Sequence, residues 1–305
     1  MKGSRMSLLV VGSVALDSIQ TPTATRDLVL GGSAVHFSYA ASFFGPVRLV
    51  GVVGEDWPQE HTELLNGRKI DTSGLHVVKG GKTFYWKGKY HSNMNDRDTL
   101  EVQLNVFGDF KPTLSDEFRR SDYLFLANAS PVTQLRTLEQ MIGPKLVVAD
   151  TMDLWIREQH DDLMQLFGQL DGLVLNDSEA KLLTGDENLV AAGHKVRQLG
   201  PKFVVIKKGE HGAMFFAEHE MYVLPAYPTA RLVDPTGAGD SFAGGMMGYL
   251  AAKNDFDPQS LKEAMAYGIV IASFNVEDFS LDRLKGIDRG ELDLRMERYK
   301  KMLSF

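Results

Sequence analysis

The sequence predicts an α/β fold, a three-layer α/β/α sandwich with a mostly parallel central sheet and a small β-sheet lid. Three observations support this prediction. Short apolar segments typical of buried strands alternate with segments typical of helices, and this alternation favours a parallel sheet. One β-rich stretch, residues 82–107, interrupts it. No repeat, low-complexity tract or convincing linker divides the 305 residues, so we expect one domain over 1–305.

The N-terminal part begins with an apolar run over 7–11, which predicts a buried first strand. The carboxylate of Asp17 follows in an expected loop, at the strand end where parallel sheets bind ligands. A glycine pair then opens a helix of small and aromatic residues within 31–45, which a Gly-Pro pair ends. Residues 47–53 form the next expected strand.

The stretch 82–107 contains alternating or β-rich segments around a polar loop at 91–98, which predicts a hairpin. Together with residues of about 17–30 it is expected to form the lid. A lid excludes water from the reacting groups. Three aromatic residues of the lid are candidates to contact either a second subunit or the substrate, namely Phe84, Tyr85 and Trp86.

The rest of the chain continues the strand and helix alternation. Strands are expected over 123–127, 145–149, 173–175 and 203–207, and a hairpin over 213–216 and 221–224. Helices are expected over 132–142, 161–170, 188–199, 261–274 and 289–303, with a further capped helix starting at Asn176.

The composition limits the classes of function. Asp and Glu outnumber Lys and Arg by 40 to 33, a net charge of −7, which argues against nucleic acid or an anionic membrane as a general partner. Any phosphate site must therefore be local. The absence of cysteine excludes disulfides, thiolate catalysis and Cys-based metal sites, and it fits a reducing cytoplasm. Because no stretch approaches the roughly 20 apolar residues of a membrane span, we expect a cytoplasmic protein.

The stretch 234–250 carries the most specific chemistry. Gly237, Ala238 and Gly239 are small enough for a tight turn that points consecutive N–H groups one way at the start of an apolar helix. Such a turn binds an anion. Asp240 at its end is repelled by that anion unless its carboxylate has a proton to take, as the base of a kinase does. Residue types alone also allow a capped, glycine-rich packing turn.

The pattern Asp-x-Thr-Gly-Ala-Gly-Asp at 234–240 resembles the signature of the ribokinase-like, or PfkB, family of carbohydrate and nucleoside kinases. Further family motifs occur in the expected order along nearly the whole chain. The resemblance implies a ribokinase-like fold with Asp240 as the base that deprotonates the substrate hydroxyl. It also implies that the N–H groups of Gly237, Ala238 and Gly239 stabilise the transferring phosphoryl group.

A second group of residues is expected at the nucleotide phosphates. Asn176-x-x-Glu179 resembles the family motif that places magnesium, with Glu179 binding Mg²⁺ through water, although on their own these residues favour a capped helix start. Lys207 begins a Lys-x-Gly-x-x-Gly motif where many relatives have threonine. The expected ATP-binding residues are Asn176, Lys207, Gly209, Gly212, Thr236 and Asn275.

The acceptor site is expected around Asp17 and the start of the helix after the glycine pair. By resemblance, Asp17 accepts hydrogen bonds from substrate hydroxyls and the glycines let the backbone approach the substrate. His36 stands where many relatives have asparagine; a lone histidine is commonly a packed residue, but here it is a candidate to face the substrate. The expected substrate contacts are Asp17, Gly31, Gly32, Ser33 and His36.

The resemblance implies an ATP-dependent phosphotransferase that uses Mg²⁺, and some relatives also use K⁺. The leading hypothesis is transfer to a hydroxymethyl or other alcohol group of a sugar or sugar-like substrate. A nucleoside kinase of the adenosine, inosine or cytidine type is the alternative, and a non-catalytic ligand-binding member is the alternative of another class. The expected partners are the acceptor, ATP and a second copy bound through the lid; neither nucleic acid nor a membrane is expected.

Overall fold

The central sheet has nine strands in the order β13-β12-β11-β10-β9-β8-β1-β4-β5. The computed structural model describes residues 7–304; residues 1–6 and 305, which the one-domain prediction includes, lie outside the described residues. All neighbours from β5 to β11 pair in parallel, and β12 and β13 add an antiparallel edge. The strands are β1 (Leu8–Val11), β4 (Val47–Gly54), β5 (Ile70–Val78), β8 (Tyr123–Leu126), β9 (Leu146–Asp150), β10 (Gly172–Asn176), β11 (Phe203–Lys207), β12 (Ala213–Phe216) and β13 (Met221–Leu224).

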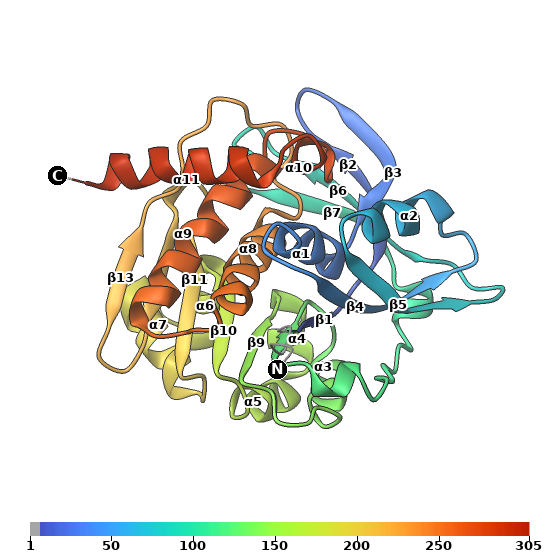
Figure 1. The fold of residues 1–305 in the computed structure, drawn as a ribbon, viewed down its shortest axis with the longest axis horizontal. Coiled ribbons are helices and arrows are strands. Elements are labelled where there is room, and N and C mark those ends of the chain that lie inside the picture. The colour runs from blue at the N-terminus through green and yellow to red at the C-terminus, as the bar shows by residue number, and fades with distance from the viewer. Residues whose placement is uncertain (1–6, 305) are drawn as a thin grey trace, which may run out of the picture.

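Helices cover both faces of this sheet, because successive strand residues alternate between two hydrophobic cores. Val148 belongs to the core shared with α1, α8, α9 and α11, whereas its neighbour Val147 belongs to the core shared with α3, α5, α6 and α7. Figure 1 shows α8 and α9 crossing in front of the strands. The three-layer prediction is confirmed. The helices are α1 (Ser33–Ala41), α2 (Gln59–Gly67), α3 (Pro131–Leu138), α4 (Asp153–Glu158), α5 (His160–Phe167), α6 (Asp177–Thr184), α7 (Leu189–Gln198), α8 (Ala238–Lys253), α9 (Pro258–Asn275), α10 (Asp282–Lys285) and α11 (Arg289–Leu303), with short 3₁₀ turns at Asn105–Phe107, Phe118–Arg120 and Gly209–His211.

A smaller sheet of four strands, in the order β3-β2-β6-β7, lies beside the main body (Figure 1). Its strands are β2 (Ala15–Gln20), β3 (Thr25–Gly31), β6 (Phe84–Tyr90) and β7 (Arg97–Gln103). The two outer pairs are antiparallel and β2 pairs with β6 in parallel. The predicted hairpin within 82–107 is therefore confirmed.

One expectation about local structure was wrong, and one stretch that carried no prediction forms regular structure. Asp17 was expected in a loop, but it lies inside strand β2, where pairing with both β3 and β6 fixes its backbone. The stretch 57–81 had no assigned element, yet it forms α2 and β5. The polar helix α2 buries only Leu65, and β5 is a half-exposed edge strand, so neither carries a strong apolar pattern.

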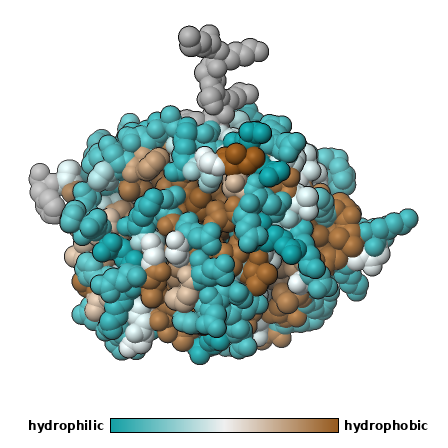
Figure 2. Space-filling model, turned by 90° about the horizontal axis from the view of Figure 1, so that it is seen from below, coloured by the Kyte–Doolittle hydropathy of each residue, from teal (hydrophilic) through white to brown (hydrophobic). Residues whose placement is uncertain are grey.

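Hydrophilic and hydrophobic residues are mixed on the surface of the molecule. The face shown in Figure 2 is largely hydrophilic, with hydrophobic residues spread between polar ones. No helix among residues 7–304 is long and apolar enough to cross a membrane.

Close contact between α8 and α1 places the start of α8 against the sheet. A Cβ added to Gly244 would lie 2.2 Å from the carbonyl oxygen of Phe37, so only glycine permits this distance between the helices. Gly248, one turn later, would meet Ala41 Cα at 2.8 Å. Because backbone atoms cannot move aside as a flexible side chain does, we infer that the position of α8 depends on these glycines.

We therefore expect Gly244→Ala to lower the free energy of unfolding by about 1–3 kcal/mol through overpacking. Gly67→Ala is the matched control, because a Cβ on this glycine at the end of α2 meets no atom within 4 Å. The control should be neutral or slightly stabilising. Urea unfolding of both variants measures the difference, and equal stability of the two would contradict this account of the helix contact.

Candidate active site

Three neighbouring parallel strands end in polar residues on the same face of the central sheet. Asp150 is the last residue of β9, Asn176 of β10 and Lys207 of β11. In the ladders Asn176 is opposite Lys207, and Asp150 is opposite Val174, two residues before Asn176. Since Val174 packs in the core formed with α8, all three side chains are directed to the α8 side. This edge is where open parallel sheets bind ligands.

Helix α8 begins at this edge with a left-handed turn. Its N-cap, Gly237, has φ 74°, a conformation that favours glycine. The N–H of Ala238 donates to Pro235 O (3.1 Å), whereas within residues 7–304 the N–H groups of Gly237, Gly239 and Asp240 have no acceptor. Free N–H groups at a helix start attract anions.

The amine of Lys207 lies beside this turn. A Cβ added to Gly239 would be only 2.8 Å from Lys207 Nζ, so glycine leaves the room that the amine occupies. The loop after Lys207 bends at Gly209 (φ 52°) and Gly212 (φ 85°). A Cβ at Gly212 would meet Leu224 O at 2.0 Å, which shows that this glycine serves the β12–β13 hairpin.

Asn275, at the end of α9, forms hydrogen bonds to the residues on both sides of the turn that begins α8. Its Nδ2 donates to Thr236 O (2.8 Å), and its Oδ1 accepts from Ser241 Oγ (3.0 Å). His36 Nδ1 lies 3.2 Å from the same oxygen. The Asn275 side chain is 1% exposed, so the structure places it under the turn rather than at an open nucleotide surface.

His36 supports the same turn from α1. A Cβ on Gly237 would lie 2.2 Å from His36 Nδ1, so the imidazole packs directly against this glycine. Burial lowers the pKa of His36, which keeps the ring neutral. The histidine is therefore packed and hydrogen-bonded, and a direct contact with the acceptor stays a prediction.

Asn176 and Glu179 form a capping box at the start of α6. Asn176 Oδ1 accepts from Glu179 N (2.8 Å), and Glu179 Oε2 accepts from Asn176 N (2.7 Å). Burial raises the pKa of Glu179 to about 7, although the nearby charge of Lys207 lowers it. Among the described residues the second carboxylate oxygen, Oε1, has no hydrogen-bond partner, so the cap leaves it available.

Asp150 is a residue that the sequence analysis missed. Its carboxylate is 5% exposed and, among the described residues, Oδ1 has no partner. Burial raises its pKa well above the usual value, and the charge of Asp240 adds to this effect. Its place as the last residue of a parallel strand, like Asn176 and Lys207, was the available signal; the expected strand ended one residue too early.

A second buried carboxylate, that of Asp17, lies against the glycine pair Gly31-Gly32. A Cβ on Gly31 would lie 2.0 Å from Asp17 Oδ2, and Gly32 has φ 97°. Ser33 begins α1, and its hydroxyl lies 2.9 Å from that of Ser13. Burial, and after it the charge of Asp234, raise the pKa of Asp17 to about 8. Among the described residues, Asp17 has no ion-pair partner.

The family model of the pfkB family carbohydrate kinases matches residues 7–283 of this chain. The chain belongs to this family. A cytidine kinase of Thermococcus kodakarensis is 29% identical over 249 residues, which cover 79% of this chain and 87% of that protein. This pfkB family member is therefore an enzyme, a kinase of the same family as these sugar and nucleoside kinases.

Solved structures confirm the ribokinase-like fold of this family member. The Methanocaldococcus jannaschii nucleoside kinase matches with a TM-score of 0.77 at 19% identity, over 97% of this chain and 100% of that one. Aminoimidazole riboside kinase from Salmonella enterica, complexed with aminoimidazole riboside and an ATP analog, matches with a TM-score of 0.74 at 18% identity, over 95% and 99%.

The polar groups at this edge suit a nucleotide phosphate with Mg²⁺. Two of the buried polar atoms that lack a partner within residues 7–304 lie here, Asp150 Oδ1 and Thr151 Oγ1. Glu179 adds an oxygen ligand of the kind that Mg²⁺ prefers, and Lys207 adds a cation for phosphate oxygens. The donor set of the pfkB kinase therefore fits a magnesium nucleotide.

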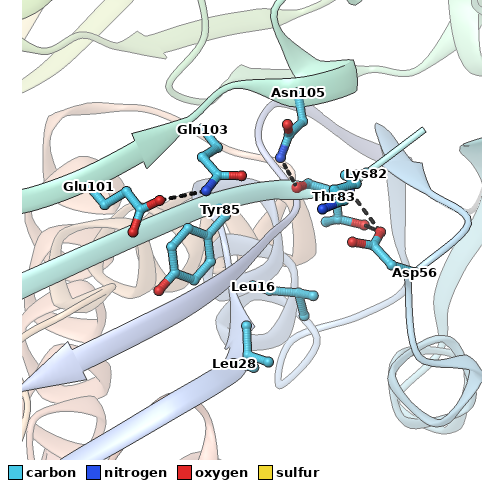
Figure 3. Close-up of a pocket in the computed structure, with 9 residues that line it drawn as sticks. All are labelled: Leu16, Leu28, Asp56, Lys82, Thr83, Tyr85, Glu101, Gln103 and Asn105. Atoms are coloured by element: carbon cyan, nitrogen blue, oxygen red, sulfur yellow. Dashed lines mark hydrogen bonds between the residues drawn. The ribbon is translucent and has the colours of Figure 1, made fainter.

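The hollow in Figure 3, about 320 Å³ in volume, is a different place. It lies against the face of the smaller sheet that carries Leu16 and Tyr85, which are opposite each other in the β2–β6 ladder. Asp17 and Trp86, the next pair in that ladder, point to the other face. None of the expected catalytic residues lines this hollow, so we do not place the phosphoryl-transfer site there.

The raised pKa of Asp17 predicts a pH-dependent stability. Its unfolded carboxyl titrates near its ordinary value of 3.8 and its folded carboxyl near 8, so its contribution to the free energy of unfolding falls as pH rises between these values. Asp17→Asn removes this loss. We expect the variant to be more stable than the native chain by a few kcal/mol at about pH 8.5, and by much less at about pH 4.5.

Urea unfolding at both pH values tests this expectation. The matched control is Asp27→Asn, on the exposed part of the neighbouring strand β3, which should change stability little at either pH. A stability gain of Asp17→Asn that does not grow with pH would show that this carboxyl does not titrate as the structure implies.

Proposed function

We propose that this pfkB family kinase transfers the γ-phosphoryl group of ATP to the hydroxymethyl group of a nucleoside. The observation that carries the proposal is an aromatic platform beside Asp17. Trp86 is opposite Asp17 in the β2–β6 ladder, so both side chains lie on one face of the smaller sheet. A carboxylate for ribose hydroxyls beside an aromatic ring for a base matches the two halves of a nucleoside.

Gly88 and Thr99 fix the position of the Trp86 ring. A Cβ on Gly88 would lie 2.0 Å from Trp86 Cη2, so the indole lies over the glycine and only glycine allows it. Trp86 Nε1 donates to Thr99 Oγ1 (3.3 Å) on the next strand. The ring is only partly buried, which leaves surface on which a base can stack. The cytidine kinase and nucleoside kinase relatives support the same acceptor class.

The proposed chemistry places Asp240 as the general base. A bond forms between the acceptor oxygen and the γ-phosphorus, the bond to the β-phosphate oxygen of ATP breaks to release ADP, and the hydroxyl proton passes to Asp240. The free N–H groups of Gly237 and Gly239, with Lys207 Nζ beside them, stabilise the charge on the transferring group. Ala238 N–H is already bonded to Pro235 O, so we assign it a smaller share.

Asn176, Glu179 and Asp150 lie where they can hold the magnesium nucleotide, with Glu179 contacting Mg²⁺ through water. When bound, Mg²⁺ neutralises charge on the phosphate oxygens. On the acceptor side, we propose that Gly31, Gly32 and Ser33 border the sugar hydroxyls near Asp17. The smaller sheet acts as the lid of a single catalytic domain. A homodimer through this lid and a K⁺ requirement stay predictions.

A sugar or sugar-like acceptor is the second candidate. The family consists of carbohydrate kinases by its description, and the Asp17 carboxylate recognises a diol in either class. The non-catalytic alternative has little support, because Asp240, the glycine turn and Glu179 are all present.

The proposed base predicts a specific kinetic loss. We expect Asp240→Asn to lower kcat by about 100-fold or more while the dissociation constant for Mg·ATP changes little. Asp109→Asn, an exposed carboxylate on a loop, is the control and should keep the native kcat. Coupled-assay kinetics and calorimetry provide the two readouts, and native turnover in Asp240→Asn would rule out this mechanism.

The acceptor class is tested by ADP release with cytidine, inosine, adenosine, ribose and 2-dehydro-3-deoxygluconate. We expect the highest kcat/KM for a nucleoside, and we expect Trp86→Ala to raise its KM by about 10-fold through lost base stacking. Tyr85→Ala, on the opposite face of the same strand, is the matched control and should leave KM unchanged. A preference for free sugars that is insensitive to Trp86 would favour the second candidate.

A further inference from the structure

Arg97, the first residue of β7, is placed by the smaller sheet toward the catalytic turn. It is opposite Tyr90 in the β6–β7 ladder, so the two side chains lie on the same face. The Tyr90 hydroxyl lies 3.1 Å from Thr236 Oγ1, in the turn that leads to Asp240. The face that carries Arg97 therefore contacts the turn that binds the phosphoryl group in our proposed mechanism.

Among the described residues, the guanidinium of Arg97 has no hydrogen-bond or ion-pair partner. Its Cζ lies over the Trp86 ring, 5.9 Å from the ring centroid. Its charge reaches the active site: it lowers the pKa of Glu179, although burial dominates and raises that pKa. It acts in the same direction on Tyr90, whose pKa burial raises to about 12.

The loop before Arg97 contacts the loop that follows Lys207. Asn95 Nδ2 donates to Glu210 Oε1 (3.1 Å), which belongs to the loop that follows Lys207. A Cβ on Gly209 would lie 3.3 Å from Asn95 Oδ1, so the two loops touch. This contact joins the smaller sheet to β11, whose last residue lies beside the glycine turn.

We propose that Arg97 is a catalytic residue that contacts the γ-phosphate of ATP from the smaller sheet, while Lys207 contacts it from the central sheet. The Asn95–Glu210 contact holds the arginine in place. Arginine suits this role because its planar guanidinium donates two hydrogen bonds to phosphate oxygens and stays protonated throughout the transfer. The inference rests on the proposed phosphoryl transfer and not on the identity of the acceptor.

This arrangement links turnover to the position of the smaller sheet. The site has several buried carboxylates and one lysine near the turn, so an additional positive charge matters when negative charge builds on the transferring group. Because Arg97 and the acceptor platform Trp86 are on the same sheet, the sheet that borders the acceptor site also carries the arginine.

The test compares Arg97→Gln and Arg97→Lys with Lys89→Ala as the matched control. Lys89 is exposed on the same sheet, next to Tyr90, but points to the opposite face. We expect Arg97→Gln to lower kcat by about 100-fold, with partial recovery in Arg97→Lys. Calorimetry should show that Arg97→Gln weakens Mg·ATP binding by about 10-fold but leaves Mg·ADP binding within about 2-fold, because only ATP carries the γ-phosphate.

The binding comparison needs no acceptor, so it remains informative if the nucleoside assignment fails. An unchanged ratio of ATP to ADP affinity in Arg97→Gln would overturn the proposal, as would an equal loss in Lys89→Ala, which would indicate a general charge effect. Asn95→Ala provides a second line of evidence. It should reduce the preference for ATP over ADP in the same direction, and native affinities for both nucleotides would show that the loop contact does not hold the arginine.

Discussion

The hydrogen bonds of one buried amide hold the candidate active site together. Asn275 donates to Thr236 O and accepts from Ser241 Oγ, so it joins the C-terminal end of α9 to both sides of the turn that begins α8. His36 bonds the same amide and packs against Gly237. The unpaired N–H groups of this turn can bind an anion only while they stay aligned, so the turn needs support from its surroundings. The neutral imidazole and the amide provide this support without adding charge.

The second constraint is the excess of buried negative charge. Asp17, Asp234, Asp150 and Glu179 all have raised pKa values, with burial as the main cause in each case. Lys207 is the cation beside the turn. A magnesium nucleotide would bring the positive charge that these carboxylates lack, although its phosphates bring negative charge as well. This balance explains why an additional guanidinium from the smaller sheet would be useful during transfer.

Much of the architecture could be predicted from local patterns. The strand β11, the β12–β13 hairpin and helix α11 have the expected bounds, because each carries a clear period or turn chemistry. The expectations failed where the pattern was weak. Asp17 was taken for a loop residue because its strand carries a carboxylate, and α2 and β5 were missed because they bury few apolar residues.

By itself, the sequence determined the kinase signature, the glycine turn with Asp240, and the polar residues Asn176, Glu179 and Lys207, since these depend on residue type and spacing. Only the tertiary structure decided which of them meet. It placed Lys207 against Gly239, His36 and Asn275 behind the turn, and Asp150 at the same sheet edge. It also placed Trp86 beside Asp17 and Arg97 beside Tyr90. The reason is physical: strand register and helix packing bring together residues far apart in the chain, and no local pattern encodes those distances.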